Sequence, residues 1–288
     1  MSDYVIFTDS SCDLTADTLK EWNIPCVELM FRNDATGDEY TQKEMGIKEF
    51  YSQMRSGVVF KTAAANMNAF VEAFEPVVAG GKDILYVGFS SGLSSTVSAG
   101  DAAAKDLMAK YPDRKIIAID TLCASAGEGL ILYHAYKKQQ EGASLEENAK
   151  YVTDLIPHLD HWFTVDDLVY LKRGGRVSAT AAFIGGMLDI KPVLNVDDEG
   201  HLIARFKVRS RKKSIAAIAE KYSELCIEPE TCEYFISHGD CLEDAEALEK
   251  LIADKYGHKA TIITNVGPVI GAHSGPGTLA LFFIGKNR

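Results

Sequence analysis

Short apolar runs alternate with longer helical segments through the first half of the chain, and this alternation constrains the fold more than any other feature. Each apolar run ends in a polar turn, as buried strands do. The runs occupy residues 4–7, 84–89 and 115–119, and the helical segments occupy residues 66–79, 95–111 and 124–140. Strands that alternate with helices form βαβ units, so we expect a mainly parallel sheet here.

The pattern changes after a further predicted helix at residues 146–156. Six strand-like runs follow at residues 161–165, 192–196, 202–208, 234–237, 260–264 and 278–284, with helical segments at residues 214–226 and 242–256. We therefore expect an α/β protein with two packed α/β domains. Residues 1–160 would hold the parallel sheet, and residues 161–288 would hold a mixed sheet.

Composition excludes several classes of protein. The formal net charge of -11 argues against nucleic acid as a partner, because phosphate binding requires a basic surface. No apolar run approaches the roughly 18 residues of a transmembrane helix, and the N-terminus lacks the pattern of a signal peptide. The six cysteines lack metal-site spacing, so we expect no metal site, reduced thiols and a cytoplasmic location.

Polar loops follow three of the predicted strands, at residues 8–13, 90–96 and 120–125. Ligands of parallel sheets bind at such strand ends. Residues 90–96 carry five hydroxyl side chains in seven positions, at the start of a helix. Helix capping requires only one or two hydroxyls, so this loop favours an anion site with Ser94 and Ser95 as donors. The loop has neither a P-loop lysine nor a nucleophile elbow.

Other polar residues are ambiguous in isolation. The residues around Asp9 indicate a structural loop and helix cap more than a nucleophilic carboxylate. Thr62 alone is typical of a turn or cap residue. Residues 267–277 form a glycine- and proline-rich run with one imidazole, His273, between two apolar stretches. We expect a loop there that holds His273 over a ligand, because glycine permits close approach and proline fixes the backbone.

Basic residues gather in two places of this acidic chain. Arg173 and Arg176 flank a Gly-Gly pair, which fits either an anion or partner contact or an interdomain turn. Residues 206–213, which include Arg209, fit either a solvated face or contact with an acidic partner. Residues 183–194 are rich in large apolar side chains, which form core or line a long apolar cavity.

Taken in order, these motifs resemble the DegV family of bacterial fatty-acid-binding proteins. The resemblance covers essentially the whole chain, and the order of several distinctive motifs makes it specific. The matching positions are residues 8–14, Lys61 with Thr62, residues 90–96, Asp120 with Ser125 and Gly127, and residues 168–176, 190–194, 207–209 and 271–277.

The resemblance implies a non-catalytic protein that encloses one long-chain fatty acid between or beside its two domains. It also implies that the protein is the acyl-binding subunit of a fatty-acid kinase. In that role it presents the carboxylate to a separate ATP-using subunit for acyl-phosphate formation, without a cofactor of its own. Carried over by position, Thr62, Ser94, Ser95 and His273 would bind the carboxylate, and Arg209 and Arg173 would contact the kinase or the phosphate.

Two segments depart from the family pattern. Residues 63–65 are alanines where the family usually has Ser-Gln-Pro, and Ser95 stands where it usually has glycine. Head-group geometry or lipid preference would therefore differ from the family pattern. Two alternatives stay open: a serine/histidine hydrolase or phosphotransferase using Ser94, His273 and either Asp9 or Asp120, and a carrier of another amphiphilic lipid.

Overall fold

A four-stranded parallel sheet organises the first half of the chain. The computed structural model describes residues 4–177 and 189–288. The strand order is β2-β1-β6-β7, comprising β2 (Cys26–Val27), β1 (Tyr4–Asp9), β6 (Asp83–Gly88) and β7 (Ile116–Asp120). Every pairing in it is parallel, which confirms the prediction from the strand-helix alternation.

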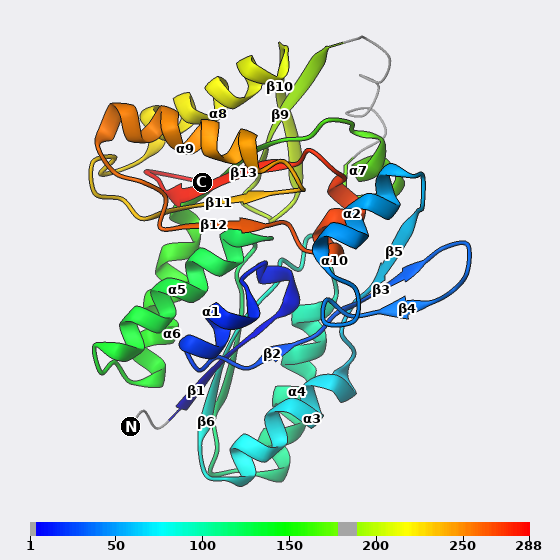
Figure 1. Cartoon of the computed structure of the whole chain (residues 1–288). Coiled ribbons are helices and arrows are strands. Elements are labelled where there is room, and N and C mark those ends of the chain that lie inside the picture. Colours follow the sequence, from blue (N-terminus) through cyan, green and yellow to red (C-terminus); the bar gives the residue numbers. More distant parts are fainter. Residues whose placement is uncertain (1–3, 178–188) are drawn as a thin grey trace.

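Helices cover both faces of this sheet (Figure 1). On one face lie α3 (Met67–Ala79) and α4 (Thr96–Lys110), and on the other lie α5 (Ala126–Gln140) and α6 (Leu145–Leu155). Successive side chains of a strand point to opposite faces, so Ile6 packs with the α5 cluster while Phe7 packs with the α3–α4 cluster. A short helix, α1 (Ala16–Glu21), follows β1 and the 3-10 turn η1 (Ser10–Cys12).

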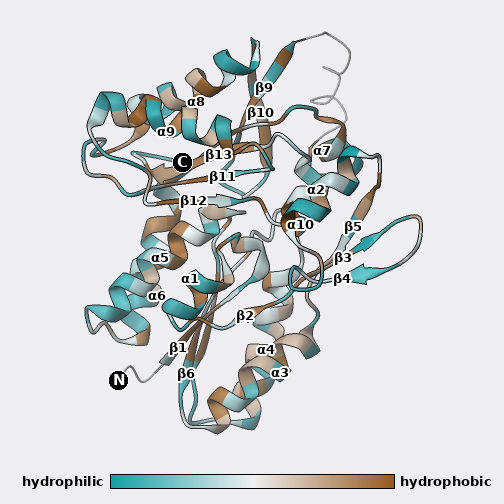
Figure 2. Ribbon diagram, in the orientation of Figure 1, coloured by the Kyte–Doolittle hydropathy of each residue, from teal (hydrophilic) through white to brown (hydrophobic). Residues whose placement is uncertain are grey.

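The second half forms a six-stranded mixed sheet, as predicted. Its order is β10-β9-β8-β13-β11-β12, comprising β10 (Leu202–Arg209), β9 (Ile190–Val196), β8 (Leu159–Thr164), β13 (Leu279–Ile284), β11 (Tyr234–His238) and β12 (Ile262–Asn265). Only the β11–β12 pairing is parallel. Most strands of both sheets are largely hydrophobic, whereas the outer helix α6 is largely hydrophilic (Figure 2).

Helix α5 joins the two halves. One face of the mixed sheet is covered by α8 (Arg211–Leu225) and α9 (Leu242–Tyr256). The other face packs on α5, which also contacts β1 and β6 of the parallel sheet. Residue 160 lies within β8, after the 3-10 turn η2 (Ile156–His158). Because α5 packs against both sheets, the domain boundary expected at residue 160 stays a prediction.

A small third sheet was not anticipated from the sequence. It has the order β4-β3-β5, with β3 (Met30–Asn33), β4 (Glu39–Tyr40) and β5 (Phe60–Ala63), beside α2 (Ile47–Arg55). Its core is aromatic: Phe31, Phe50 and Phe60 contact one another with ring centroids 4.9–5.7 Å apart. This sheet carries Thr62 on β5.

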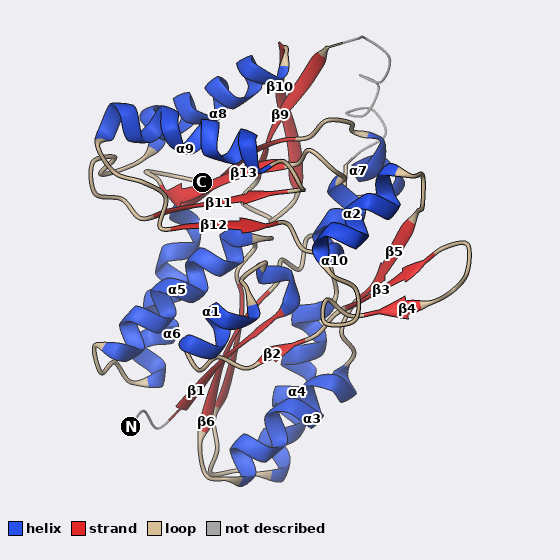
Figure 3. Ribbon diagram, in the orientation of Figure 1, coloured by secondary structure: helices blue, strands red, loops and turns tan. Residues whose placement is uncertain are grey.

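Two sequence expectations require correction. The run expected as a loop around His273 contains a helix, α10 (Pro268–Ser274), which lies beside β5 and α7 (Figure 3). Pro268 suits its first position, where no N–H is needed, and Gly275 ends it at φ 83°. The segment after β8, where no helix was predicted from the sequence, contains α7 (Val169–Arg173). In the apolar segment 183–194, residues 183–188 lie outside the described residues, and Ile190–Val196 is β9.

Candidate functional site

A largely apolar cavity of ≈ 290 Å³ lies where the two sheets and α10 meet. Its walls come from β5, from the loops after β6 and β7, from α10, and from the α5-facing side of the mixed sheet. The ligand site expected at the strand ends of the parallel sheet therefore coincides with a real cavity.

Within the described ranges, no helix is long and apolar enough to cross a membrane.

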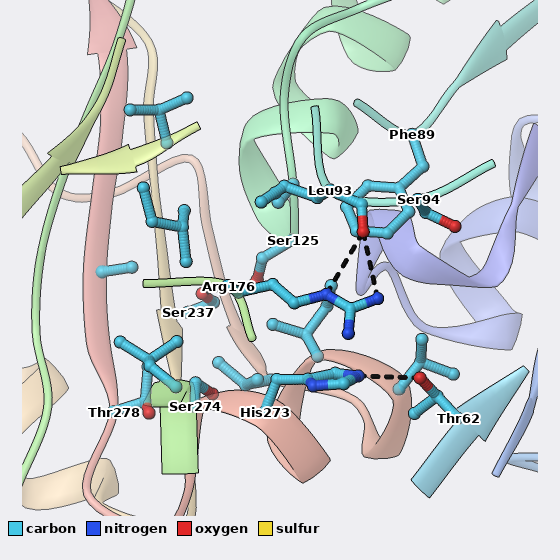
Figure 4. A pocket seen from close by; sticks show the side chains of 18 of the residues that line it. Thr62, Phe89, Leu93, Ser94, Ser125, Arg176, Ser237, His273, Ser274 and Thr278 are labelled. Carbon is cyan, nitrogen blue, oxygen red and sulfur yellow. Dashed lines mark hydrogen bonds between the residues drawn. The ribbon is translucent and has the colours of Figure 1, made fainter. Parts of the chain in front are cut away.

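Thr62 and His273 meet at one end of this cavity. The Thr62 Oγ1 lies 2.7 Å from the His273 Nε2, joining β5 to α10 (Figure 4). The His273 Nδ1 is buried and has no hydrogen-bond partner among the residues described. Gly174 packs against that nitrogen, and a Cβ at position 174 would lie 2.1 Å from Nδ1. The ring position therefore depends on glycine at 174.

The His273 imidazole is neutral in this environment. Burial, and to a smaller extent the positive charge of Arg176, lowers the pKa of His273 from 6.5 to about 4. A neutral imidazole offers one donor and one acceptor nitrogen. A carboxylate placed beside it would favour the charged ring and so raise the pKa.

Arg176 supplies a cation at the same end of the cavity. Its Nε and Nη2 donate to the Leu93 carbonyl at 3.3 and 3.1 Å, and its Nη1 donates to the Gly174 carbonyl. Burial lowers the pKa of the half-buried guanidinium, and no described carboxylate forms an ion pair with it. Sequence reasoning left the Arg-Gly-Gly-Arg motif open and selected Arg173 as a site residue. The structure places Arg176 in the cavity wall, and the kinase or phosphate contact expected of Arg173 stays a prediction.

Arg173 lies outside the main cavity. Its exposed guanidinium stands 5.6 Å from the centre of the Tyr170 ring. It lines a smaller pocket of ≈ 240 Å³ that shares Thr62, Arg176 and His273 with the main cavity. Arg209 is exposed at the end of β10 and lines neither pocket.

Ser94 and Ser95 both line the cavity, as do Ala63 and Ala64. The Ser94 Oγ lies 2.9 Å from the Thr96 Oγ1 and 3.3 Å from the Thr96 backbone N, so it also helps to start α4. Ser95 is exposed and makes no capping bond with its side chain. Ser94 can therefore both cap α4 and contact a ligand in the cavity.

A second polar group in the cavity wall was not predicted from the sequence. The Ser125 Oγ lies 2.9 Å from the Ser237 Oγ and donates to the buried Asp13. Asp13 also accepts from the Gly267 backbone N at 2.9 Å, directly before α10. Burial raises the pKa of Asp13 to about 7. Asp13 thus links the loop after β1, the start of α5 and the start of α10.

Asp9 and Asp120 hold loops in place and do not line the cavity. Asp9 accepts from the Tyr86 hydroxyl at 2.6 Å and from the Phe89 backbone N at 3.1 Å. Asp120 accepts from the Ser91 and Leu122 backbone N atoms at 3.1 and 3.0 Å. Neither carboxylate is hydrogen-bonded to His273 in the described part of the chain. The hydrolase alternative therefore has no carboxylate there that would orient the histidine.

Comparisons with known proteins agree along the whole chain. A family model described as "Uncharacterised protein, DegV family" matches residues 3–286. A DegV domain-containing protein from Clostridium perfringens is 42% identical, over 100% of this chain and 99% of its own length. A crystal structure described as a DegV lipid-binding protein from Thermotoga maritima has a TM-score of 0.86 at 27% identity, covering 100% of both chains.

A structure described as showing fatty-acid binding of a DegV family protein from Thermus thermophilus has a TM-score of 0.88 at 26% identity. It covers 98% of this chain and 99% of that one. The family match spans nearly every residue, and the two-sheet α/β fold is shared with both structures. The chain belongs to the DegV family.

Proposed function

We propose that this protein binds one long-chain fatty acid, with its carboxylate at the Thr62–His273 pair and its tail against the mixed sheet. The observation that supports this proposal is that the cavity has a polar end and a mainly apolar wall. The Thr62 hydroxyl, the His273 imidazole and the Arg176 guanidinium lie together at one end, and most of the remaining wall is aliphatic or aromatic. That apolar wall includes Leu29, Phe89, Phe163, Leu171, Val196, Leu202 and Phe282.

The tail supplies most of the binding free energy in this proposal. Burial stabilises each methylene by about 0.8 kcal/mol, so roughly 14 methylenes contribute about 11 kcal/mol before association costs of several kcal/mol. The carboxylate would be costly to bury without partners. Thr62, Ser94, His273 and Arg176 offer hydrogen bonds and one positive charge for it.

The related structures support the same ligand class. The Thermotoga maritima protein is described as lipid-binding and the Thermus thermophilus protein as fatty-acid-binding, and both share this fold over nearly the full chain. Carriers of other amphiphiles would have the same division between a polar end and an apolar wall. The acyl carboxylate is favoured because Arg176 has no acidic partner among the described residues.

We further propose that the protein is the acyl-binding subunit of a cytoplasmic fatty-acid kinase. It would present the carboxylate to a separate ATP-using subunit and then hold the acyl phosphate. The smaller pocket beside Thr62 supports this role, because Arg173 there stands next to the proposed head group and is open to solvent. Arg209, exposed at the end of β10, is the proposed contact with the kinase.

We propose no catalysis by the chain itself. Ser94 is hydrogen-bonded to Thr96, and no bond joins it to His273 in the described part of the chain. A serine nucleophile requires such a base. A fluorophosphonate probe should therefore leave Ser94 unlabelled, and labelling with ester turnover would favour the hydrolase alternative.

Organic extraction of freshly purified protein, followed by mass spectrometry, tests the proposed ligand. We expect about one long-chain fatty acid per chain. Recovery of a different amphiphile would show that the ligand is not a fatty acid. Recovery of nothing, together with no binding of added fatty acid, would contradict the proposal.

A further inference from the structure

His161 is a buried polar residue in the apolar part of the cavity. It lies on β8, is 2% exposed and lines the cavity wall. Neither ring nitrogen makes a hydrogen bond of normal geometry to the residues that the structure describes, and only the Leu159 backbone interacts weakly with the ring. Its ring stands edge-on to Phe282, with centroids 5.5 Å apart at 85°. A polar side chain thus occupies a place where its neighbours are aromatic.

The register of the mixed sheet places His161 far from the proposed head group. Thr278 lines the cavity near Ser274 and His273 (Figure 4), and Phe282 lies four residues further along β13. Because an antiparallel strand rises about 3.4 Å per residue, Phe282 is about 14 Å beyond Thr278. His161 pairs with Phe282 in the sheet. His161 therefore faces the distal part of a bound acyl chain.

The surroundings keep the His161 ring neutral and in place. Burial lowers the pKa of His161 well below its usual value, the positive charge of Arg288 lowers it further, and the Leu159 backbone opposes this to a smaller extent. A neutral ring has one donor and one acceptor. Gly127 at the start of α5 makes room for it, since a Cβ there would lie 2.6 Å from Nε2.

An unsubstituted tail would cover this ring, exclude water from it and offer no hydrogen bond in exchange. Leaving a buried polar group unpaired is unfavourable. A hydroxyl or keto group on the chain meets the same difficulty, because it loses its own hydration on burial. When the two groups face each other, each satisfies the other.

We propose that His161 recognises a polar substituent on the distal part of the acyl chain. The preferred ligands are then long-chain fatty acids that carry a hydroxyl or keto group far from the carboxylate. This inference rests on the proposed fatty-acid binding and adds a second polar contact to it. The class is an oxygenated fatty acid, and the position of the oxygen is set by the distance between His273 and His161.

Competition binding with delipidated full-length protein tests the inference. The probes are octadecanoic acid and a series of hydroxyoctadecanoic acids whose hydroxyl moves along the chain. One hydrogen bond between buried groups corresponds to a preference of roughly tenfold, so we expect one distal isomer to bind roughly tenfold more tightly than octadecanoic acid. Isomers with the hydroxyl near the carboxylate should bind more weakly.

Two variants separate the hydrogen bond from packing. His161→Phe keeps an aromatic ring beside Phe282, and should lose the preference for the distal isomer while binding octadecanoic acid at least as well. His161→Gln keeps a donor and an acceptor, and should retain part of the preference. Thermal unfolding of each variant checks that the fold is intact.

The outcomes also separate this inference from the proposed function. If octadecanoic acid binds but no hydroxy isomer binds more tightly, the role of His161 is wrong and fatty-acid binding stands. A preference that is unchanged in His161→Phe would also overturn it. If no fatty acid binds at all, the proposed function itself fails.

Discussion

The Thr62 Oγ1 and the His273 Nε2 lie 2.7 Å apart, although 211 positions separate the two residues in the chain. The bond joins the small third sheet to α10, and both elements line the cavity. Either side chain alone could cap a helix or lie on the protein surface. Together they form a donor–acceptor pair at the point where a carboxylate would enter.

His273→Ala should impair phosphorylation of the bound acid more than it impairs lipid retention. In the proposed binding mode the tail supplies most of the binding free energy, and one hydrogen bond contributes about 1 kcal/mol, so affinity should fall about fivefold. In the proposed role with a kinase, acyl-phosphate formation would depend on the position of the carboxylate, and it should fall at least tenfold. Equilibrium binding of a fluorescent fatty acid and a coupled kinase assay measure the two effects. Equal losses in both would contradict this division of roles.

Gly174→Ala should disrupt the head-group site by displacing His273. The backbone at position 174 has φ -73°, which alanine adopts readily, but the added Cβ would lie 2.1 Å from the His273 Nδ1. The Thr62–His273 bond should therefore break, and fatty-acid affinity should fall at least as far as in His273→Ala. Titration with a fluorescent fatty acid measures this loss.

Gly175→Ala is the matched control. Gly175 has φ 70° and no atom near the position of an added Cβ, so the cost there is backbone strain alone. It should lower the free energy of unfolding by about 1 kcal/mol and leave affinity unchanged. The reverse pattern, with binding lost in Gly175→Ala and kept in Gly174→Ala, would refute the packing argument.

Local sequence patterns predicted most of the fold. Runs such as Tyr4–Asp9 and Asp83–Gly88 are apolar because both faces of their sheet are covered, and the helices between them have clear periodicity. The third sheet was missed because β4 has only two residues, and two residues carry no detectable alternation. Helix α10 was missed because Gly267, Gly271 and Gly275 suggest a loop, while Pro268 at its first position is a helix signal.

The candidate site was predictable only in part. Ser94 and Ser95 came from the hydroxyl-rich loop, His273 came from the glycine- and proline-rich run, and only Thr62 depended on the order of the motifs. All four residues line the cavity. Arg176 could not be separated from Arg173 by pattern, because their difference lies in which side of a short turn each faces. His161 gave no signal at all, since a histidine in a strand is indistinguishable in sequence from any half-buried polar residue.

Asp13→Asn should flatten the pH dependence of stability between about pH 4 and about pH 7. The pKa of Asp13 is raised by burial from 3.8 to about 7, so in this interval the folded state holds a proton that the unfolded state has released. The resulting stabilisation is complete below pH 3.8 and is lost as the pH rises through about 7. Asparagine is permanently neutral and tolerates the left-handed backbone at this position, φ 54°.

Urea unfolding at a series of pH values measures the effect for the parent protein and the variant. Other buried carboxylates, including Asp160 with a pKa raised to about 7 by burial, titrate in both proteins. The difference between the two curves therefore isolates Asp13. Parallel curves from pH 4 to pH 7 would show that Asp13 is already ionised in the folded state.

Arg176→Gln should weaken binding of an acid but not of a matched alcohol. The guanidinium is held at the head-group end by the Leu93 carbonyl, and its charge has no acidic partner among the described residues. Loss of one charge-assisted contact should lower the affinity for octadecanoic acid about tenfold. Octadecanol has the same tail without the negative charge, so its affinity should change little. Arg176→Lys keeps the charge but loses the paired bonds to Leu93, and should give an intermediate loss for the acid. Equal weakening of acid and alcohol in Arg176→Gln would mean that Arg176 supports the loop at Leu93 and does not read the carboxylate.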